Sequence, residues 1–319
     1  MIDRISVLGL GTMGHGIVQA FAMAGIPVVA WDEVEAARES LVSRISRNLD
    51  KFIEADLLDA DAAEATLSCI SLAASEEQAV AGVPFVTEAI AENLEIKQQV
   101  LARIETMMER EAIIASNSST YPISASGALL RHPERAVVTH WFNPPHIVPT
   151  VEVVPSPKTD ERTISTSIAL LKRIGKVPVR VNVELPGFLV NRVQIALGRE
   201  IWDLLDRGVA SAEDIDAAIV GSMGFRLAAL GPLRIQDFAG LDIHGHVHEH
   251  LVKEISSSTE IPASVQKILA DGHLGYKSGR GFYTYDAETS PQVLAERDRR
   301  YLALLKLARD AAREDEIPG

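Results

Sequence analysis

The sequence contains only one cysteine, Cys69, so no disulfide can form within the chain and nothing indicates an oxidising compartment. It also lacks a basic excess: 31 Lys and Arg stand against 44 Asp and Glu, and the formal net charge of −13 makes a nucleic-acid partner unexpected. No apolar run approaches the roughly 20 residues of a membrane span, and the charges at Asp3 and Arg4 are not typical of a secretory signal. We therefore expect a cytoplasmic protein with neither a membrane nor a nucleic-acid partner.

Strand and helix patterns alternate through the first part of the chain. Its 319 residues suffice for two domains, and 47% hydrophobic with 24% charged residues is an ordinary composition for domains with a buried core. The alternation predicts an α/β domain over residues 1–185, with a Rossmann-type, doubly wound parallel sheet. The expected strands are 5–8, 27–31, 84–90, 112–115, 136–140, 151–154 and 177–181.

After Pro186 the pattern becomes almost purely helical. Glycines separate the apolar-periodic segments, and serines or acids precede several of them, as at helix starts. The pattern predicts an all-α C-terminal domain over residues 186–319. Its expected helical segments are 188–206, 211–222, 231–253, 261–271 and 291–312.

A glycine-rich turn joins the first expected strand to the first helix. Gly9 permits the tight turn, Gly11 lets the backbone approach a pyrophosphate, and Gly14 allows close packing of helix on strand. Unpaired amides at the helix start favour a phosphate there. Asp32, after the second strand, suits ribose hydroxyls and would repel a 2′-phosphate, so the pattern predicts NAD rather than NADP. The cofactor-binding residues expected here are Gly9, Gly11, Thr12, Met13, Gly14 and Asp32.

Residues 34–71 form an excursion between strands. Two amphipathic helical segments are expected there, and Cys69 reads as a small apolar strand residue rather than a reactive thiol. The basic residues Arg44, Arg47 and Lys51 fit a solvated helix face, although insertions of this kind also cover substrate sites.

Polar residues follow the later strands, at the edge where ligands bind in open α/β sheets. Residues 116–120 read Ser-Asn-Ser-Ser-Thr, and the stretch 139–154 places His140 after one apolar run and Glu152 within the next. A histidine that takes a proton and a carboxylate that stabilises the imidazolium form a catalytic pair. Taken alone, His140 is also compatible with a hydrogen-bonded histidine in the core.

Further motifs accompany this pair in a fixed order, from Ile5 to about Tyr285. They are Gly9-x-Gly11-x-x-Gly14, Glu88 to Lys97, Ser116 to Ser119, His140 to Pro144, Val151 to Val153, Pro186 to Arg192 and Gly275 to Tyr283. The ordered set resembles the L-3-hydroxyacyl-CoA dehydrogenase family. The resemblance implies NAD-dependent oxidation of the 3-hydroxy group of a 3-hydroxyacyl-CoA, or of a related small 3-hydroxy acid, to the 3-keto product, with fatty acid metabolism as the context.

The same resemblance implies roles for the matching residues. His140 would remove the hydroxyl proton as hydride leaves the carbinol carbon, and Glu152 would orient and stabilise the imidazolium. Ser119 and Asn191 match the polar residues that hold the substrate oxygen in line. The matches expected on the cofactor side of the site are Glu92, Lys97 and Asn117.

One segment departs from the acyl-CoA enzymes. Gly224–Pro232 is longer than their corresponding turn and carries Arg226. With Asn143 and the prolines after it, this segment looks more like relatives acting on small free acids: L-gulonate 3-dehydrogenase with its lens crystallin homologue, L-carnitine dehydrogenase, and a pyridine-carboxylate dehydrogenase. Arg226 is the hypothesised partner of a substrate carboxylate, with a surface role as the alternative, and Asn143 is a further expected substrate contact.

Gly275–Tyr283, by contrast, is of the acyl-CoA enzyme type. The sequence therefore leaves open a thioester substrate, a non-CoA carboxylate, or a catalytically silent, crystallin-like homologue.

Histidines alternate at positions 244, 246, 248 and 250. Pairs four residues apart on a helix can bind a metal, but a polar helix face or a subunit contact is the expectation, and we predict no metal site. His146 could reach a substrate, although a plain loop histidine is expected. The family resemblance also implies a homodimer formed through the helical domain.

Overall fold

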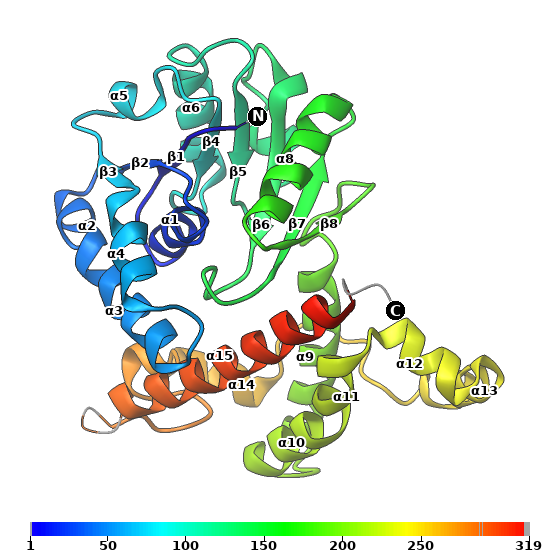
Figure 1. Ribbon diagram of the computed structural model, residues 1–319. Coiled ribbons are helices and arrows are strands. Elements are labelled where there is room, and N and C mark those ends of the chain that lie inside the picture. The colour runs from blue at the N-terminus through cyan, green and yellow to red at the C-terminus, as the bar shows by residue number, and fades with distance from the viewer. Residues whose placement is uncertain (1, 287, 289, 316–319) are drawn as a thin grey trace. The chain divides into compact units, whose positions relative to one another are not determined.

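The computed structural model describes residues 2–286, 288 and 290–315 (Figure 1). Contacts divide the chain into two compact units. The first comprises Met1–Asn191 and Asp298–Gly319, and the second comprises Arg192–Arg297. These units differ from the predicted domains, 1–185 and 186–319, in where the C-terminal segment belongs, because the chain returns to the first unit at Asp298.

An eight-stranded sheet lies at the centre of the first unit, in the order β3-β2-β1-β4-β5-β6-β7-β8. Its strands are β1 (Ile5–Leu8), β2 (Val28–Trp31), β3 (Ile70–Leu72), β4 (Phe85–Glu88), β5 (Ile113–Ser116), β6 (Ala136–Trp141), β7 (Thr150–Pro155) and β8 (Val177–Arg180). Neighbouring strands are parallel except β6 and β7, which are antiparallel. The predicted Rossmann-type sheet is confirmed apart from this reversal. Only a short loop joins β6 to β7, whereas a parallel pair needs a long crossover.

The edge strand β3 lies in a segment that the sequence predicts to be helical. Its three residues are partly exposed and too few to show an alternating pattern. Cys69 caps the C-terminus of α4 (Ala60–Ser68) and directly precedes β3, so the prediction that Cys69 is a strand residue is wrong by one position. Its free thiol is partly buried.

Helices cover both faces of the sheet. Besides α4 they are α1 (Gly14–Met23), α2 (Glu35–Glu39), α3 (Leu41–Glu54), α5 (Glu76–Val80), α6 (Leu94–Glu105), α7 (Ile123–Ser126), the 3-10 turn η1 (Pro133–Arg135) and α8 (Glu161–Arg173). Ile113 and Ala115 belong to one buried cluster, with α1, α3 and α8, while Ile114 belongs to the other, with α5, α6 and α7. Alternate residues of a strand thus serve opposite layers, which explains why the central strands are apolar throughout.

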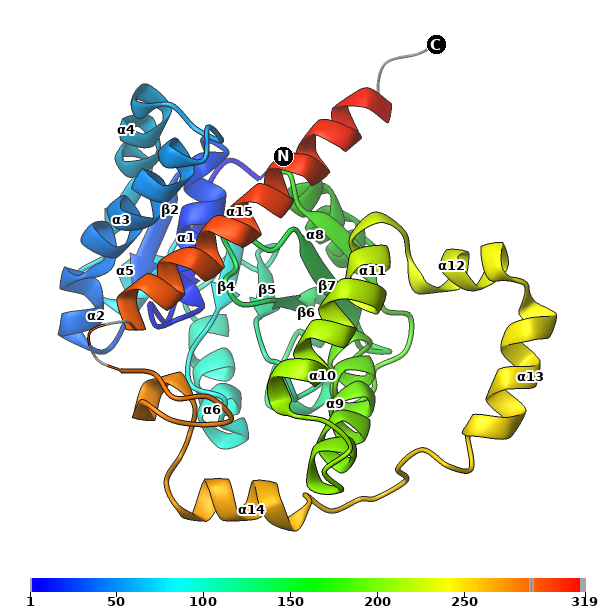
Figure 2. The same ribbon diagram turned by 90° about the horizontal axis from the view of Figure 1, so that it is seen from below.

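The C-terminal helix α15 (Ser290–Asp315) packs on the first unit from Asp298 onward (Figure 2). Leu302 and Leu305 form a third apolar cluster with α3 and with the loop between β6 and β7. Lys51 Nζ of α3 lies 2.7 Å from Asp298 Oδ2. Apolar packing and an ion pair therefore attach this helix to α3 and to the β6–β7 loop of the first unit.

The second unit is built mainly from helices, as predicted. They are α9 (Val190–Asp206), α10 (Ala212–Ile219), the π-helical turn η2 (Val220–Gly224), α11 (Phe225–Ala229), α12 (Pro232–Ala239), α13 (Leu241–Leu251), α14 (Ala263–Ala270) and the 3-10 turn η3 (Tyr276–Ser278). The predicted segment 231–253 divides at Gly240, whose φ of 95° is left-handed and ends α12. The predicted segment 211–222 instead continues through η2 into α11.

No single helix within the described residues is long and apolar enough to cross a membrane. One bent pair, Ala212–Ala229 with Pro232–Ala239, meets the criteria of length and composition.

Replacing Leu302 by alanine tests whether α15 is a structural part of the first unit. Leu302 is 1% exposed, whereas Leu304 on the same helix is 51% exposed. Loss of a buried leucine side chain costs about 2–5 kcal/mol through lost burial and the cavity left behind. We expect Leu302→Ala to lower the free energy of unfolding by an amount in this range, measured by urea denaturation, and Leu304→Ala to change it by less than about 1 kcal/mol. Equal effects of the two variants would contradict the packing described.

Candidate active site

The glycine-rich turn between β1 and α1 has the shape that a dinucleotide requires. A Cβ at Gly9, where φ is 88°, would lie 2.6 Å from the Ala89 carbonyl oxygen, and a Cβ at Gly14 would lie 1.7 Å from the Gly9 carbonyl oxygen. Gly11 differs, since no heavy atom of the described residues lies within 4 Å of a Cβ built there. The turn is therefore closed against the sheet at two glycines and open at the third, where a pyrophosphate would approach.

Thr12 and Met13 connect this open position to α1. Met13 is the residue preceding the helix, and among the described residues no side chain caps the first turn. The His15 amide donates to the Gly11 carbonyl oxygen at 3.3 Å, but no side chain of the described residues competes with an anion at the start of α1, and the positive end of the helix dipole favours one. These residues fit the pyrophosphate of NAD, as the sequence predicts.

Asp32 lies beside the turn, immediately after β2. Its carboxylate accepts hydrogen bonds from the backbone amides of Leu10 at 2.5 Å and Val34 at 2.8 Å. Arg44 of α3 donates to the Leu10 carbonyl oxygen at 2.7 Å and is partly buried. The prediction of a solvated face is therefore wrong for Arg44, because its guanidinium ties α3 to the cofactor turn. An amphipathic pattern cannot show a bond across 34 positions of sequence.

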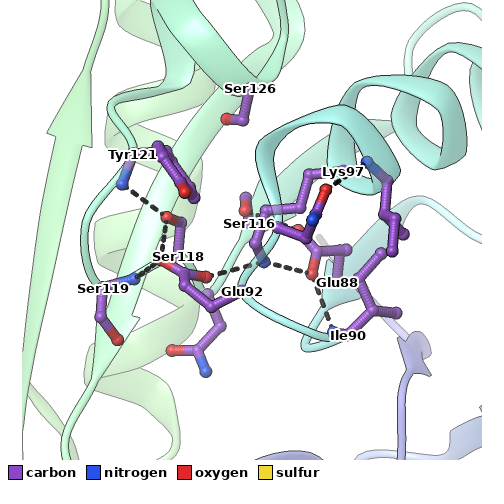
Figure 3. Close-up of polar contacts among 12 residues, drawn as sticks. Glu88, Ile90, Glu92, Lys97, Ser116, Ser118, Ser119, Tyr121 and Ser126 are labelled. Carbon is purple, nitrogen blue, oxygen red and sulfur yellow. Dashed lines mark hydrogen bonds and ion pairs between the residues drawn. The ribbon is translucent and has the colours of Figure 1, made fainter.

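A buried ion-pair network lies where β4 and β5 end (Figure 3). Lys97 of α6 is fully buried, with Nζ 2.8 Å from Glu88 Oε1 and 3.2 Å from Glu92 Oε2. Glu88 also accepts hydrogen bonds from Ser116 Oγ at 2.6 Å and from the Ile90 amide at 2.8 Å. Buried charges are tolerated when they are paired and hydrogen-bonded, as here. Glu88 is absent from the predicted site because the resemblance singled out Glu92 and Lys97 in that motif.

Glu92 holds the loop that follows β5 (Figure 3). Its Oε1 accepts hydrogen bonds from Ser118 Oγ at 2.7 Å and from the amides of Ser119 and Thr120, each at 2.9 Å. Burial by itself raises the pKa of Glu92, but the Lys97 charge and these hydrogen bonds outweigh it and lower the pKa below the ordinary value of 4.5. An ionised Glu92 thus fixes the backbone of Ser119. Contact of Glu92 and Lys97 with the cofactor stays a prediction.

His140 and Glu152 face each other across the antiparallel pair β6–β7. They are direct partners in the register, and His140 Nδ1 lies 2.7 Å from Glu152 Oε2. A carboxylate only accepts hydrogen bonds, so we assign the proton of this bond to Nδ1, which leaves Nε2 as the ring atom that can accept a proton. Both side chains are buried. The strand reversal therefore creates the pair that the sequence predicts, since it places two residues of adjacent strands directly opposite each other.

The second oxygen of Glu152 binds the start of α9. Oε1 accepts hydrogen bonds from the amides of Leu189 at 3.1 Å and Val190 at 2.8 Å. Phe188, just before them, has a left-handed φ of 49°, which is uncommon for a bulky residue. Its buried ring lies against His140, with ring centroids 5.5 Å apart. Phe188 therefore supports the pair through its backbone turn and through its ring. Sequence reasoning missed it, although it lies inside the motif that supplies Asn191.

Asn117, Ser119 and Asn191 meet beside this pair. Asn191 Nδ2 donates to the Ser119 carbonyl oxygen at 3.3 Å, and Asn117 Oδ1 accepts a hydrogen bond from the Trp141 amide at 2.9 Å. Trp141 directly follows His140, so Asn117 is attached to the end of β6, while Asn191 is joined to the loop that bears Ser119. The substrate role of Ser119 and the cofactor role of Asn117 stay predictions.

Two predicted substrate contacts lie outside this cluster of hydrogen bonds. Asn143 is exposed in the loop after β6, and its peptide bond to Pro144 is cis. Arg226 is exposed on α11 of the second unit, where its Nε donates to the Ser222 carbonyl oxygen at 3.3 Å. Both contacts stay predictions.

The alternating histidines lie on α13 of the second unit. His250 Nδ1 is 2.8 Å from the His246 carbonyl oxygen, and the two rings lie 4.3 Å apart between centroids, tilted by 52°. Over the part of the chain that the structure describes, no group of three or more His, Cys, Asp or Glu side chains could hold a metal ion.

A dinucleotide turn followed by a buried His–Glu pair is typical of NAD-dependent dehydrogenases that act on a hydroxyl group. A model of the 3-hydroxyacyl-CoA dehydrogenase NAD-binding domain matches residues 4–184, and a model of the 3-hydroxyacyl-CoA dehydrogenase C-terminal domain matches residues 187–285. The chain therefore belongs to the 3-hydroxyacyl-CoA dehydrogenase family and is an NAD-dependent oxidoreductase. Helix α15 lies beyond both matched ranges.

Relatives of two kinds match along nearly the whole chain. A 5-formyl-3-hydroxy-2-methylpyridine 4-carboxylate 5-dehydrogenase of Mesorhizobium japonicum is 36% identical, covering 96% of this chain and 98% of that protein. A probable 3-hydroxybutyryl-CoA dehydrogenase of Bacillus subtilis is 34% identical, covering 91% and 99%. The mitochondrial hydroxyacyl-coenzyme A dehydrogenase of Sus scrofa is 32% identical, covering 89% and 92%.

Solved structures of both kinds share the fold. A structure of the pyridine-carboxylate 5-dehydrogenase, described as an NAD+ dependent dismutase, superposes with a TM-score of 0.90 at 36% identity, covering 96% of this chain and 98% of that one. The (S)-3-hydroxybutyryl-CoA dehydrogenase of Ralstonia eutropha superposes with a TM-score of 0.73 at 31% identity, covering 90% and 100%.

Proposed function

We propose that the protein oxidises a hydroxyl group of a small carboxylate substrate, with His140 as the general base and Glu152 as its partner. The observation that carries the proposal is the buried 2.7 Å contact between His140 Nδ1 and Glu152 Oε2, which leaves Nε2 able to accept a proton. NAD, when bound, supplies the hydride acceptor for the carbinol carbon. His140 takes the hydroxyl proton, and the imidazolium that forms is stabilised by a carboxylate already held in place.

Neighbouring residues support the same chemistry by position. Asn191 and Ser119 come together beside the pair, and the loop that carries Ser119 is fixed by Glu92. Polar groups held in this way orient a hydroxyl oxygen toward His140 rather than transfer its proton. Burial of the pair strengthens each electrostatic contact, because little solvent screens it.

Replacing His140 by glutamine separates chemistry from cofactor binding. Glutamine keeps hydrogen-bonding ability near Glu152 but cannot act as a base, so we expect kcat to fall by about 10²–10⁴-fold while the Kd for NADH stays within about two-fold. NADH formation by absorbance and NADH binding by fluorescence titration measure the two quantities. The partly exposed His132 supplies a control, His132→Gln, that should change neither. Parallel loss of NADH binding and turnover in His140→Gln would assign the histidine to folding instead.

A free carboxylate is the substrate class that we propose. The TM-score of 0.90 with the pyridine-carboxylate enzyme, against 0.73 with a hydroxybutyryl-CoA enzyme, supports this choice. So does Arg226 in the longer Gly224–Pro232 segment, because a guanidinium binds a carboxylate through two parallel hydrogen bonds. A CoA thioester is the second candidate, supported by the acyl-CoA type of Gly275–Tyr283 and by the Bacillus and pig relatives.

A substrate panel decides between the classes. NADH formation is followed with 3-hydroxybutyryl-CoA, 3-hydroxybutyrate, carnitine, gulonate and the pyridine carboxylate named for the Mesorhizobium enzyme. We expect the highest kcat/KM with a free acid, and Arg226→Ala to raise its KM by about 10-fold or more, since a charged hydrogen bond is worth about 1.5–3 kcal/mol. Exposed Arg234 on α12 provides the matched control, Arg234→Ala. Activity confined to the thioester would overturn the proposed class, and NAD binding without any turnover would favour a silent homologue.

We also propose a homodimer formed through the second unit. Large apolar side chains of this unit are exposed, with Phe225 and Phe238 each at 76% and Leu233 at 75%. The three apolar clusters found among the described residues contain none from Arg192–Arg297. Large apolar side chains exposed in this way are typical of an interface. We expect light scattering at micromolar concentration to give twice the 34.6 kDa mass of one chain. A single-chain mass would contradict the proposal.

The cytoplasmic location expected from the sequence stays a prediction.

A further inference from the structure

Lys176, just before β8, is a buried lysine that the proposed reaction does not use. Its Nζ donates to the carbonyl oxygens of Pro145 and Val148, each at 2.7 Å, and lies 5.4 Å from the centre of the Trp141 ring. Among the residues that the structure describes, no carboxylate forms an ion pair with it. Burying an ammonium without a counter-charge is costly. Here main-chain carbonyl groups compensate the Lys176 ammonium, and no ion pair within the described residues explains why a lysine is buried at this position.

The two carbonyl groups belong to the loop of residues 142–149, which we call the His140 loop because it follows β6 and its catalytic histidine. Several elements press on this loop from other directions. Ile147 packs with Phe52, Leu302 and Leu305, and a Cβ added at Gly16 of α1 would lie 2.7 Å from Pro145 Cγ. The loop is therefore held by α1, α3, α15 and Lys176 together.

The end of β6 is held through the same lysine. The Trp141 ring contacts both Phe21 of α1, with ring centroids 5.6 Å apart, and the Lys176 Nζ, 5.4 Å from its centroid. Because Trp141 is the next residue after His140, a shift of this ring or of the loop turns the backbone that presents the imidazole. The α1 helix that carries Gly16 and Phe21 also begins at the cofactor turn, so the loop connects the two halves of the site.

We propose that Lys176 is a positioning residue for His140: by tethering the His140 loop through Pro145 and Val148, it fixes the distance between the imidazole and Glu152 and the placement of both relative to the cofactor turn. The inference rests on the proposed role of His140, and it gives a function to a lysine outside the reacting groups. A displacement of about 1 Å in a reacting group can cost about 100-fold in rate.

The hydrogen bonds of Lys176 to Pro145 and Val148 do not require Lys176 to be charged. Burial, and then repulsion from Arg309, lowers the pKa of Lys176 from 10.5 to about 7. His146 in the same loop is the other titratable group here, and burial, followed by the charges of His15 and Lys176, lowers its pKa to about 3. A neutral amine still has two N–H donors, which match the two carbonyl acceptors, so the tether persists on deprotonation.

Lys176→Met tests the proposal, with exposed Lys172→Met on α8 as the matched control. We expect Lys176→Met to lower kcat by about 10–100-fold while NADH affinity stays within about two-fold. The downfield proton NMR signal of the His140 Nδ1–H, which reports its bond to Glu152, should shift or broaden in Lys176→Met and stay in place in Lys172→Met. That signal separates positioning from a general loss of stability.

Gly16→Ala supplies a second variant that keeps the lysine, in case Lys176→Met does not fold. A methyl group there pushes the His140 loop from the side of α1, so we expect the same shift of the His140 signal and a similar fall in kcat. Gly198→Ala, in open space on α9, is its control. Unchanged kcat in Lys176→Met, or a fall in kcat with the His140 signal unchanged in either variant, would overturn the proposal. If His140→Gln loses activity while Lys176→Met keeps the kcat of the unaltered protein, the proposed function stands and only this inference fails.

Discussion

The Glu152 carboxylate is the contact on which the arrangement of the site depends. One oxygen binds His140 across the β6–β7 pair, and the other accepts the first amides of α9. A single buried group therefore joins the end of the sheet, the proposed base His140 and the start of the helix that carries Asn191. A carboxylate at a helix N-terminus is stabilised by the main-chain amides and by the helix dipole, so these contacts hold Glu152 in a fixed position beside His140.

A second buried network fixes the backbone at the carboxyl ends of β4 and β5. Lys97 lies between Glu88 and Glu92, and the two carboxylates hold the strand end and the loop that bears Ser119 (Figure 3). The Lys97 side chain has no exposed surface, and its ammonium pairs with both carboxylates. The network thus fixes the backbone of the strand end and of the loop, which places the polar groups of the site.

The fold and the reacting pair could be predicted from the sequence because each depends on local pattern: strand periodicity, the glycine turn, and residues that follow strands. The antiparallel turn of β7, the left-handed Phe188 and the tether from Lys176 depend instead on contacts between distant segments. Lys176 reads as an ordinary basic residue before a strand, and nothing local shows that its ammonium meets Pro145 and Val148. The attachment of α15 cannot be predicted from the sequence for the same reason, because Leu302 packs on α3, some 250 positions earlier in the chain.

In the proposed function, the two compact units have separate tasks, the chemistry in the first and recognition of the substrate in the second. His140, Glu152 and the cofactor turn belong to the first unit, where the sheet and three apolar clusters fix them. Arg226 lies in the second unit, on a short helix after a π-helical turn. Its neighbours in sequence, Phe225 and Leu227, are large apolar residues with exposed side chains. Under this proposal, a reacting centre held by the sheet is combined with a separate recognition segment, and the names of the relatives record both a thioester and a pyridine carboxylate as substrates.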